Sequence, residues 1–96
     1  MFIGIFTSKS GTSELRARTK PAHDEYWVTH MPNLNFAGPM LTDDGETRLG
    51  QIVVLDVEDR KTAEDILGND PFVKAGLFSE YFVRRFRPSV IEGQAT

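Results

Sequence analysis

GQIVVLDV, residues 50–57, carries the clearest strand signal in the chain. Its β-branched residues are typical of a β-strand. FIGIF, residues 2–6, has the same character near the N-terminus. Both stretches are apolar on both alternating faces, which is the pattern of strands covered on both sides of a sheet. The sequence therefore predicts a sheet whose two faces both need covering.

The first half of the chain predicts a strand, then a helix, upstream of residues 50–57. The strand covers residues 2–7. Any helical turn over residues 13–18 is expected to end before Pro21, because proline disrupts a helix interior. A new helix then begins with Thr19 as its cap and Pro21 in its first turn, and it ends near His30.

The second half predicts two more strands and one more helix. The segment 34–40 is expected to form a strand that is bent or bulged at Gly38-Pro39, which marks a sheet edge. Asp59 caps a helix that ends at Gly68, and its apolar residues share one face. The last strand lies within residues 77–88 and is stopped by Pro88. The order of elements is therefore strand, helix, strand, strand, helix, strand.

This order predicts an α+β, ferredoxin-like βαββαβ fold with a four-stranded antiparallel sheet. The chain is expected to form one domain over residues 1–96, with a core at about residues 2–88 and a tail at residues 89–96. Two helices cover only one face of the sheet, so we expect a homodimer in which a second copy covers the other. In the alternative, the two apolar strands are simply central and hydrophobic.

Composition narrows the class of protein. The 96 residues carry a formal net charge of −3, which gives no basic surface for nucleic acid or an acidic membrane. The chain has no cysteine, which excludes disulfides, thiolate metal sites and a cysteine nucleophile. The apolar N-terminus is too short for a membrane span and lacks the features of a signal peptide. These observations predict a cytoplasmic protein without nucleic-acid or membrane partners.

The two histidines, His23 and His30, both lie on the first predicted helix. Seven residues separate them, about 10 Å along a helix, which is too far for both to bind one metal ion. The predicted first-turn position of His23 disfavours its protonated form, so His23 is expected to act as a neutral base. The alternative is a partly buried packing histidine. His30 is near the helix end, where a cation is favourable.

Asp70 stands directly before Pro71, an arrangement typical of an N-cap followed by proline at the first helical position. A carboxylate that accepts backbone N–H bonds is also suited to orient a neutral histidine. The two roles are compatible, and capping alone is the simpler alternative. Upstream, Arg16, Arg18 and Lys20 are candidates for holding an anionic substrate. Their alternative is a solvated run of surface charge.

Four stretches together resemble the YCII-related family of small proteins: KPAH at residues 20–23, AGP at 37–39, GQIVVLDV at 50–57 and NDPFVKAGLF at 69–78. The resemblance extends from Phe2 to about Pro88. It implies a ferredoxin-like dimeric α/β barrel, a cavity between sheet and helices, and a histidine–aspartate pair. One branch of the family resembles a dehydrochlorinase acting on chlorinated hydroxyquinols.

Carried over by motif, the pair is His23 and Asp70. Many relatives have arginine before the proline where this chain has Lys20, which puts a bidentate anion contact there in doubt. The other residues predicted to contact a substrate are Arg18, Tyr26, Trp27, Gly38, Pro39 and Phe72.

The leading hypothesis is a small enzyme without cofactor or metal, a lyase or isomerase acting on a ring-derived organic acid or phenol. His23 transfers the proton and Asp70 orients it. One alternative is a non-catalytic module that binds a small molecule or a partner protein. Another is a haem-dependent or cofactor-free monooxygenase of the same broad fold, with His30 or His23 as ligand in the haem version.

Overall fold

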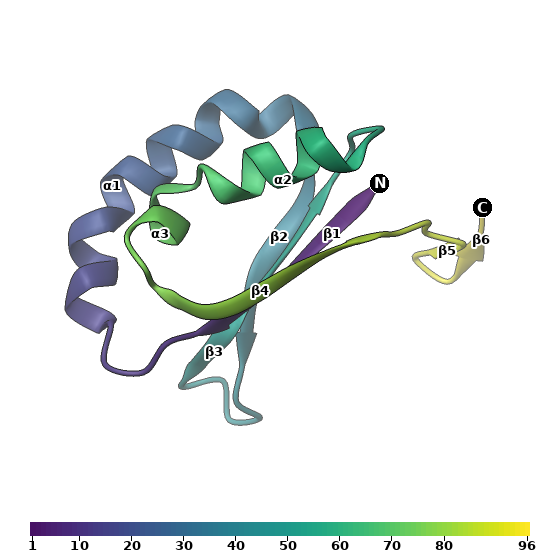
Figure 1. Ribbon diagram of the computed structural model, residues 1–96. Helices are drawn as coiled ribbons and strands as arrows, with labels where there is room; N and C mark the ends of the chain where they lie inside the picture. Colours follow the sequence, from purple (N-terminus) through teal and green to yellow (C-terminus); the bar gives the residue numbers. More distant parts are fainter.

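The computed structural model describes residues 1–96, and Figure 1 shows its secondary-structure elements. In chain order they are β1 (Phe2–Ser8), α1 (Ser13–His30), a 3₁₀ turn η1 (Met31–Asn33), β2 (Leu34–Leu41), β3 (Arg48–Leu55), α2 (Arg60–Gly68), α3 (Pro71–Lys74), β4 (Phe78–Arg85), β5 (Val90–Ile91) and β6 (Gln94–Ala95).

The four long strands form one sheet in the order β2-β3-β1-β4, with every neighbouring pair antiparallel. The apolar strands β1 and β3 are central, as their two-sided pattern indicates. All three helices lie on one side of the sheet (Figure 1). The predicted α+β, ferredoxin-like fold is confirmed. The tail, residues 89–96, carries little sequence signal and contains the short β5-β6 hairpin.

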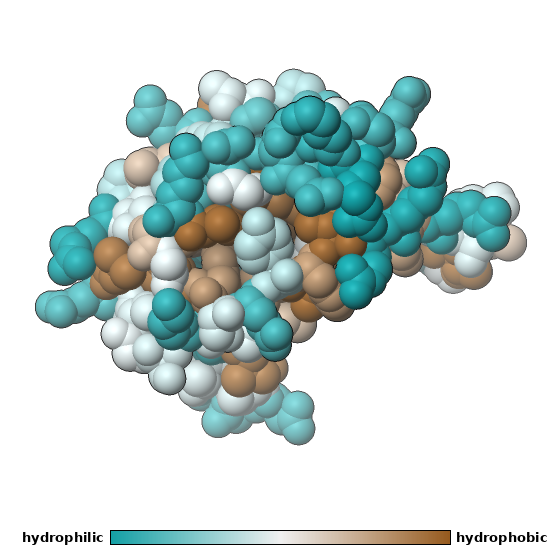
Figure 2. Space-filling view, viewed as in Figure 1, coloured by the Kyte–Doolittle hydropathy of each residue, from teal (hydrophilic) through white to brown (hydrophobic).

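The strand register divides the central residues between the two faces of the sheet. One face, which packs against the helices, carries side chains that include Phe2, Phe6, Gln51, Val53 and Val83. The other face carries Ile3, Ile5, Ile52, Val54 and Phe82. Hydrophilic residues cover the helices at the top of the molecule in Figure 2, and hydrophobic residues show through in the middle, between the helices and β4. The core therefore lies between the helices and one face of the sheet.

The predicted start of the first helix is wrong. Helix α1 begins at Ser13 and continues through Pro21, and Thr19 does not cap it, because the Thr19 hydroxyl donates to the Leu15 carbonyl (2.8 Å). Good helix formers precede the proline, and Trp27 anchors the following turns in the core, so the helix tolerates a proline cost of about 3 kcal/mol. His23 consequently lies about three turns inside α1 rather than in its first turn.

The edge position predicted for the second strand is confirmed, but the predicted irregularity at Gly38-Pro39 is wrong. Both residues pair in regular register with β3, and the register instead shifts near the two ends of β2, between Leu34 and Phe36 and between Met40 and Leu41. A proline on an edge strand needs no bulge, because its missing N–H can face solvent.

Both predicted aspartate caps are confirmed. The Asp59 side chain accepts from the backbone N–H of Thr62 (3.2 Å), and that of Asp70 accepts from the backbone N–H of Phe72 (2.9 Å). The second cap fixes the short helix α3 beneath α1.

Candidate functional site

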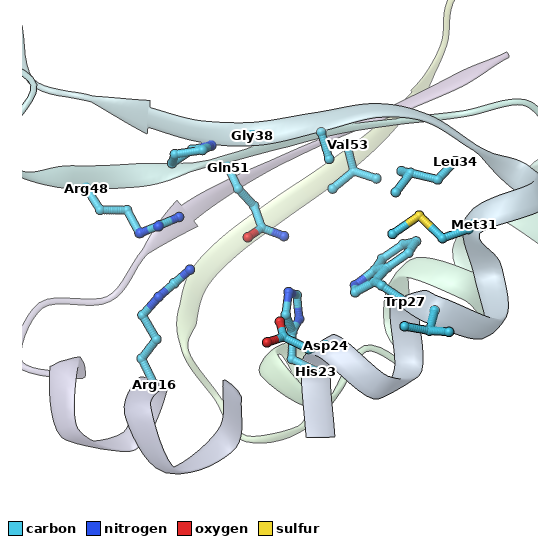
Figure 3. Close-up of a pocket in the computed structure, with 13 residues that line it drawn as sticks. Arg16, His23, Asp24, Trp27, Met31, Leu34, Gly38, Arg48, Gln51 and Val53 are labelled. Atoms are coloured by element: carbon cyan, nitrogen blue, oxygen red, sulfur yellow. The ribbon is translucent and has the colours of Figure 1, made fainter. Parts of the chain in front are cut away.

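A cavity of about 420 Å³ lies between helix α1 and the strands β2 and β3. Helix α1 contributes Arg16, His23 and Trp27, and the strands contribute a floor that includes Gln51 and Val53. Figure 3 shows these side chains pointing into the space between helix and sheet. The cavity thus uses the helix-covered face of the sheet, where the histidine predicted to be catalytic is found.

His23 and Asp70 meet at this cavity, although 47 positions separate them in the sequence. The distance from His23 Nδ1 to Asp70 Oδ1 is 2.7 Å, and the Asp70 side chain is 1% exposed. The second oxygen, Asp70 Oδ2, accepts a hydrogen bond from Trp27 Nε1 (3.0 Å). The predicted contact between the two side chains is therefore confirmed, and Trp27 is its third member.

The hydrogen bonds at Asp70 determine which histidine nitrogen carries the proton. The indole N–H of Trp27 and the backbone N–H of Phe72 can only donate, so the carboxylate acts as an acceptor toward both. An ionised Asp70 can only accept from His23 Nδ1 as well, so a neutral imidazole beside it carries its proton on Nδ1. The other nitrogen, Nε2, has no hydrogen bond within the chain and retains a lone pair at the cavity. The helix dipole does not explain a neutral His23, because His23 is not in the first turn of α1.

Phe72 supports His23 from behind. The two rings stack with centroids 3.7 Å apart and an interplanar angle of 11°, and Phe72 is fully buried. The predicted placement of Phe72 in the cavity wall is therefore wrong, because α3 holds the ring beneath His23. The stacked Phe72 ring fixes the plane of the imidazole, and the hydrogen bond to Asp70 fixes how the imidazole is turned within that plane.

The other predicted contact residues divide into two groups. Trp27, Gly38 and Pro39 line the cavity. Arg18 is exposed on α1 and does not line it. Tyr26 also lies outside, because its hydroxyl donates to the Ile66 carbonyl (2.6 Å) and ties α1 to α2. For these two residues the placement expected from the sequence is not the one observed.

We expect Tyr26→Phe to lower the free energy of unfolding by about 1 kcal/mol, because the Ile66 carbonyl loses its donor. Burial and the nearby charge of Asp70 raise the pKa of Tyr26, so folding favours the protonated hydroxyl. That contribution is fully present below the ordinary tyrosine pKa of about 10 and is lost as the pH rises through the raised value.

Urea unfolding of both proteins at pH 7 and above pH 10 measures the two effects. The phenylalanine variant should be less stable at pH 7, and the difference should shrink at the higher pH. Equal stability at pH 7 would show that the Tyr26 hydrogen bond does not stabilise the helix layer.

Arg48 and Gln51 line the cavity but are not among the residues predicted from the sequence. Gln51 shares a face with Val53 by simple alternation, so its place follows once the helix-covered face is known. Arg48 follows a different rule. Alternation from Gln51 puts Arg48 on the opposite face, but the register shift between Met40 and Leu41 turns it toward the helices. No pattern in the sequence predicts this register shift.

The candidate metal ligands do not converge. No three histidine, cysteine, aspartate or glutamate side chains lie close enough together to hold a metal ion. His30 packs against Tyr26, with ring centroids 4.5 Å apart, and does not line the cavity.

None of the helices combines the length and the apolar composition that crossing a membrane requires.

Fold and site together define a ferredoxin-like α+β protein with a buried carboxylate behind a cavity histidine. The chain belongs to the YCII-related family, since the model of the YCII-related domain matches residues 1–87. The predicted family is confirmed. A search of curated proteins gives no match.

Two solved structures are similar to this chain. The 5-chloro-2-hydroxyhydroquinone dehydrochlorinase of Burkholderia phenoliruptrix AC1100, in complex with 2,5-dihydroxybenzoquinone, is 26% identical with a TM-score of 0.78. The match covers 90% of this chain and 92% of that enzyme. The Arabidopsis thaliana protein At3g17210 is 11% identical with a TM-score of 0.50, over 95% of this chain and 96% of that one, and shows the fold alone.

Proposed function

We propose that this protein is a small acid–base enzyme, a lyase of the dehydrochlorinase kind, that acts on a hydroxylated ring compound. His23 is the catalytic base and acid, and Asp70 is the positioning residue that holds its tautomer. The observation that carries the proposal is the 2.7 Å contact from Asp70 to His23 Nδ1, which leaves Nε2 free at the cavity. A base held in this way transfers protons with a fixed direction.

Loss of HCl from a chlorinated hydroxyquinol needs only proton transfers. A proton first moves from a ring hydroxyl to the carbon that bears chlorine, which makes that carbon tetrahedral. A second hydroxyl then loses its proton, its electron pair forms a carbonyl, and chloride leaves with the carbon–chlorine bonding pair. The ring becomes a hydroxyquinone, HCl is the second product, and no oxidant or reductant is consumed. His23 Nε2 is the group that takes and returns these protons.

The size and walls of the cavity support a substrate with a single ring. Its volume of about 420 Å³ is within the usual range for small-molecule sites. Trp27 offers a flat apolar surface next to His23, and Gly38 and Pro39 form part of the opposite wall. The similar dehydrochlorinase is in complex with 2,5-dihydroxybenzoquinone, which is a compound with a single ring.

The test is to incubate the protein with 5-chloro-2-hydroxyhydroquinone in D₂O, measuring chloride release and following the product by mass spectrometry. We expect one chloride per product molecule and one deuterium at the carbon that held chlorine, because the base returns a solvent-exchanged proton there. Spontaneous loss without protein is the control. Binding of 2,5-dihydroxybenzoquinone with no chloride release would instead favour a non-catalytic binding module.

We also propose that the protein is a homodimer. The helices leave one face of the sheet uncovered, and this face carries exposed aromatic side chains at Phe36 (58%) and Phe82 (38%). If a second copy packs across a twofold axis, the uncovered sheet face of each copy is covered by that of the other in one self-complementary contact. A cytoplasmic location stays a prediction that rests on composition.

A further inference from the structure

Two arginines converge at one end of the cavity. Arg16 comes from α1, and Arg48 comes from the start of β3, where the register shift turns its side chain toward the helices. Figure 3 shows the two guanidinium groups pointing toward one another across the cavity, next to His23 and Gln51. Two like charges held at one end of a cavity repel each other.

Neither arginine has an anionic partner within the chain. The ion pairs of the structure involve other residues, and no hydrogen bond of either guanidinium is present. Arg16 makes only a cation–π contact, 4.6 Å from the Phe72 ring centroid. The one exposed acid at the cavity, Asp24, is engaged by Lys20 at 2.7 Å, and this hydrogen bond lowers the pKa of Asp24.

The electrostatics of Arg16 agree with an open anion site. Partial burial and then the charge of Arg48 lower the pKa of Arg16, while the charge of Asp70 acts in the opposite direction. An arginine side chain carries its positive charge in proteins. The repulsion between the two guanidiniums is therefore present in the free protein and is relieved when an anion binds between them.

The opposite end of the cavity is apolar. Trp27, Met31, Leu34 and Val53 gather there, away from the two arginines (Figure 3). Gln51 lies between the two ends of the cavity (Figure 3). The cavity thus has a cationic end, a central polar zone at His23 and Gln51, and an apolar end.

We propose that Arg16 and Arg48 form an oxyanion subsite that holds the carboxylate or ionised ring oxygen of a planar organic acid. The apolar part of the ligand lies toward Trp27, and the reacting carbon lies at His23. The position of the reacting carbon rests on the proposed function, whereas the anion subsite does not. A hydroxyquinone fits this site because its hydroxyl is a vinylogous acid and is ionised at neutral pH. A single guanidinium can donate two parallel N–H···O hydrogen bonds to the two oxygens of a carboxylate, and it can donate to a lone ring oxyanion as well.

Binding by isothermal titration calorimetry tests the subsite directly. The probes are 2,5-dihydroxybenzoquinone and the matched pair benzoate and benzamide, which share one shape and differ in charge. We expect benzoate to bind about tenfold more tightly than benzamide, and Arg16→Gln or Arg48→Gln each to weaken both anions by about tenfold. Arg87→Gln, which removes the same charge from an exposed position outside the cavity, is the control and should change affinity less than about twofold.

Arg18→Gln decides between the arginines of α1. A loss on Arg18→Gln but not on Arg16→Gln would overturn the proposed subsite, as would equal affinity for benzoate and benzamide, or no measurable binding of either anion by the wild type. Circular dichroism of each variant shows whether it is folded. Chloride release separates the two proposals: arginine-dependent anion binding without turnover would leave the subsite and remove the enzyme, and His23-dependent turnover without arginine dependence would do the reverse.

Discussion

Replacing His23 with asparagine is expected to lower the turnover number for chloride release by about a hundredfold to ten-thousandfold, the usual contribution of a positioned acid–base group. Asparagine keeps a polar side chain that can donate to Asp70 but has no nitrogen able to take a proton at the position of Nε2. The expected loss is in the turnover number, with a smaller change in KM, because the proton moves only in the transition state.

His30→Asn is the matched control for this variant. It makes the same substitution seven residues further along α1, at a histidine outside the cavity. We expect His30→Asn to keep wild-type turnover within about twofold, as is usual for a side chain remote from the chemistry. If His23→Asn retained more than a tenth of wild-type turnover, His23 would not be the base.

Asp70→Asn tests the positioning residue, and the structure changes what is expected of it. The capping motif alone suggests that asparagine would leave the fold nearly intact. In the structure, however, the two carboxylate oxygens accept from three donors, at His23, Trp27 and Phe72. An amide has one oxygen, so its NH₂ group must face at least one buried N–H. The cost is about 1–3 kcal/mol of stability, since a buried donor loses its acceptor.

The effect of Asp70→Asn on turnover has a separate cause. An amide NH₂ placed at the Oδ1 position donates to His23 Nδ1, which moves the imidazole proton to Nε2 and removes the lone pair from the cavity. We therefore expect a loss of turnover at temperatures where the variant is fully folded. ¹⁵N NMR of the imidazole distinguishes the two tautomers. A folded variant with the Nδ1–H tautomer and wild-type turnover would contradict the positioning role.

The sequence was enough to predict that His23 and Asp70 form a pair, but it was not enough to predict where His23 lies on its helix. Asp70 could be predicted because an aspartate before a proline has a strong local cause, and the family resemblance paired it with His23. The continuity of α1 through Pro21 could not, because local propensity favours a break there and only packing of residues such as Trp27 overrides it. The position of His23 within α1 therefore becomes clear only from the three-dimensional structure.

The placement of Arg48 at the cavity could not be predicted from the sequence either, for a different reason. Strand alternation is a rule about regular pairing, and one register shift reverses it for every residue beyond the shift. The shift between Met40 and Leu41 lies beside a turn, where the chain alone gives no preference for one pairing over the next. A cavity residue that depends on such a shift is found only from the paired strands.

The second large effect expected is on assembly: the wild type should be a dimer at micromolar concentration, and Phe82→Asp should be a monomer. Phe82 lies on the helix-free face beside Ile5, and 38% of it is exposed in the single chain. The single chain therefore tolerates a polar group there, whereas a twofold interface would bury two like charges near each other. Burial of unpaired charge is costly enough to separate subunits of this size.

Phe82 is a better position for this test than the two valines of β3. Val53 faces the helices and lines the cavity, so a charge there would damage the core instead of an interface. Val54 lies on the helix-free face but is already fully buried within the chain, so its replacement would also lower the stability of the monomer. Phe82→Asp also removes the contact of the Arg84 guanidinium with the Phe82 ring (4.6 Å), but it leaves the core on the helix side intact, so the largest effect is expected on the contact between copies.

The charges around Phe82 favour a contact between identical copies. Glu80 and Arg84 lie on the same face two positions to either side, with opposite signs. Across a twofold axis, each position meets its counterpart from the other copy in reversed order, so Glu80 of one copy can face Arg84 of the other. Light scattering after size-exclusion chromatography should show the mass halved by Phe82→Asp and unchanged by the conservative control Phe82→Leu, with the same circular dichroism for all three proteins. A wild type that elutes as a monomer at micromolar concentration would contradict the dimer, and a monomeric Phe82→Leu would show that shape rather than charge controls the contact.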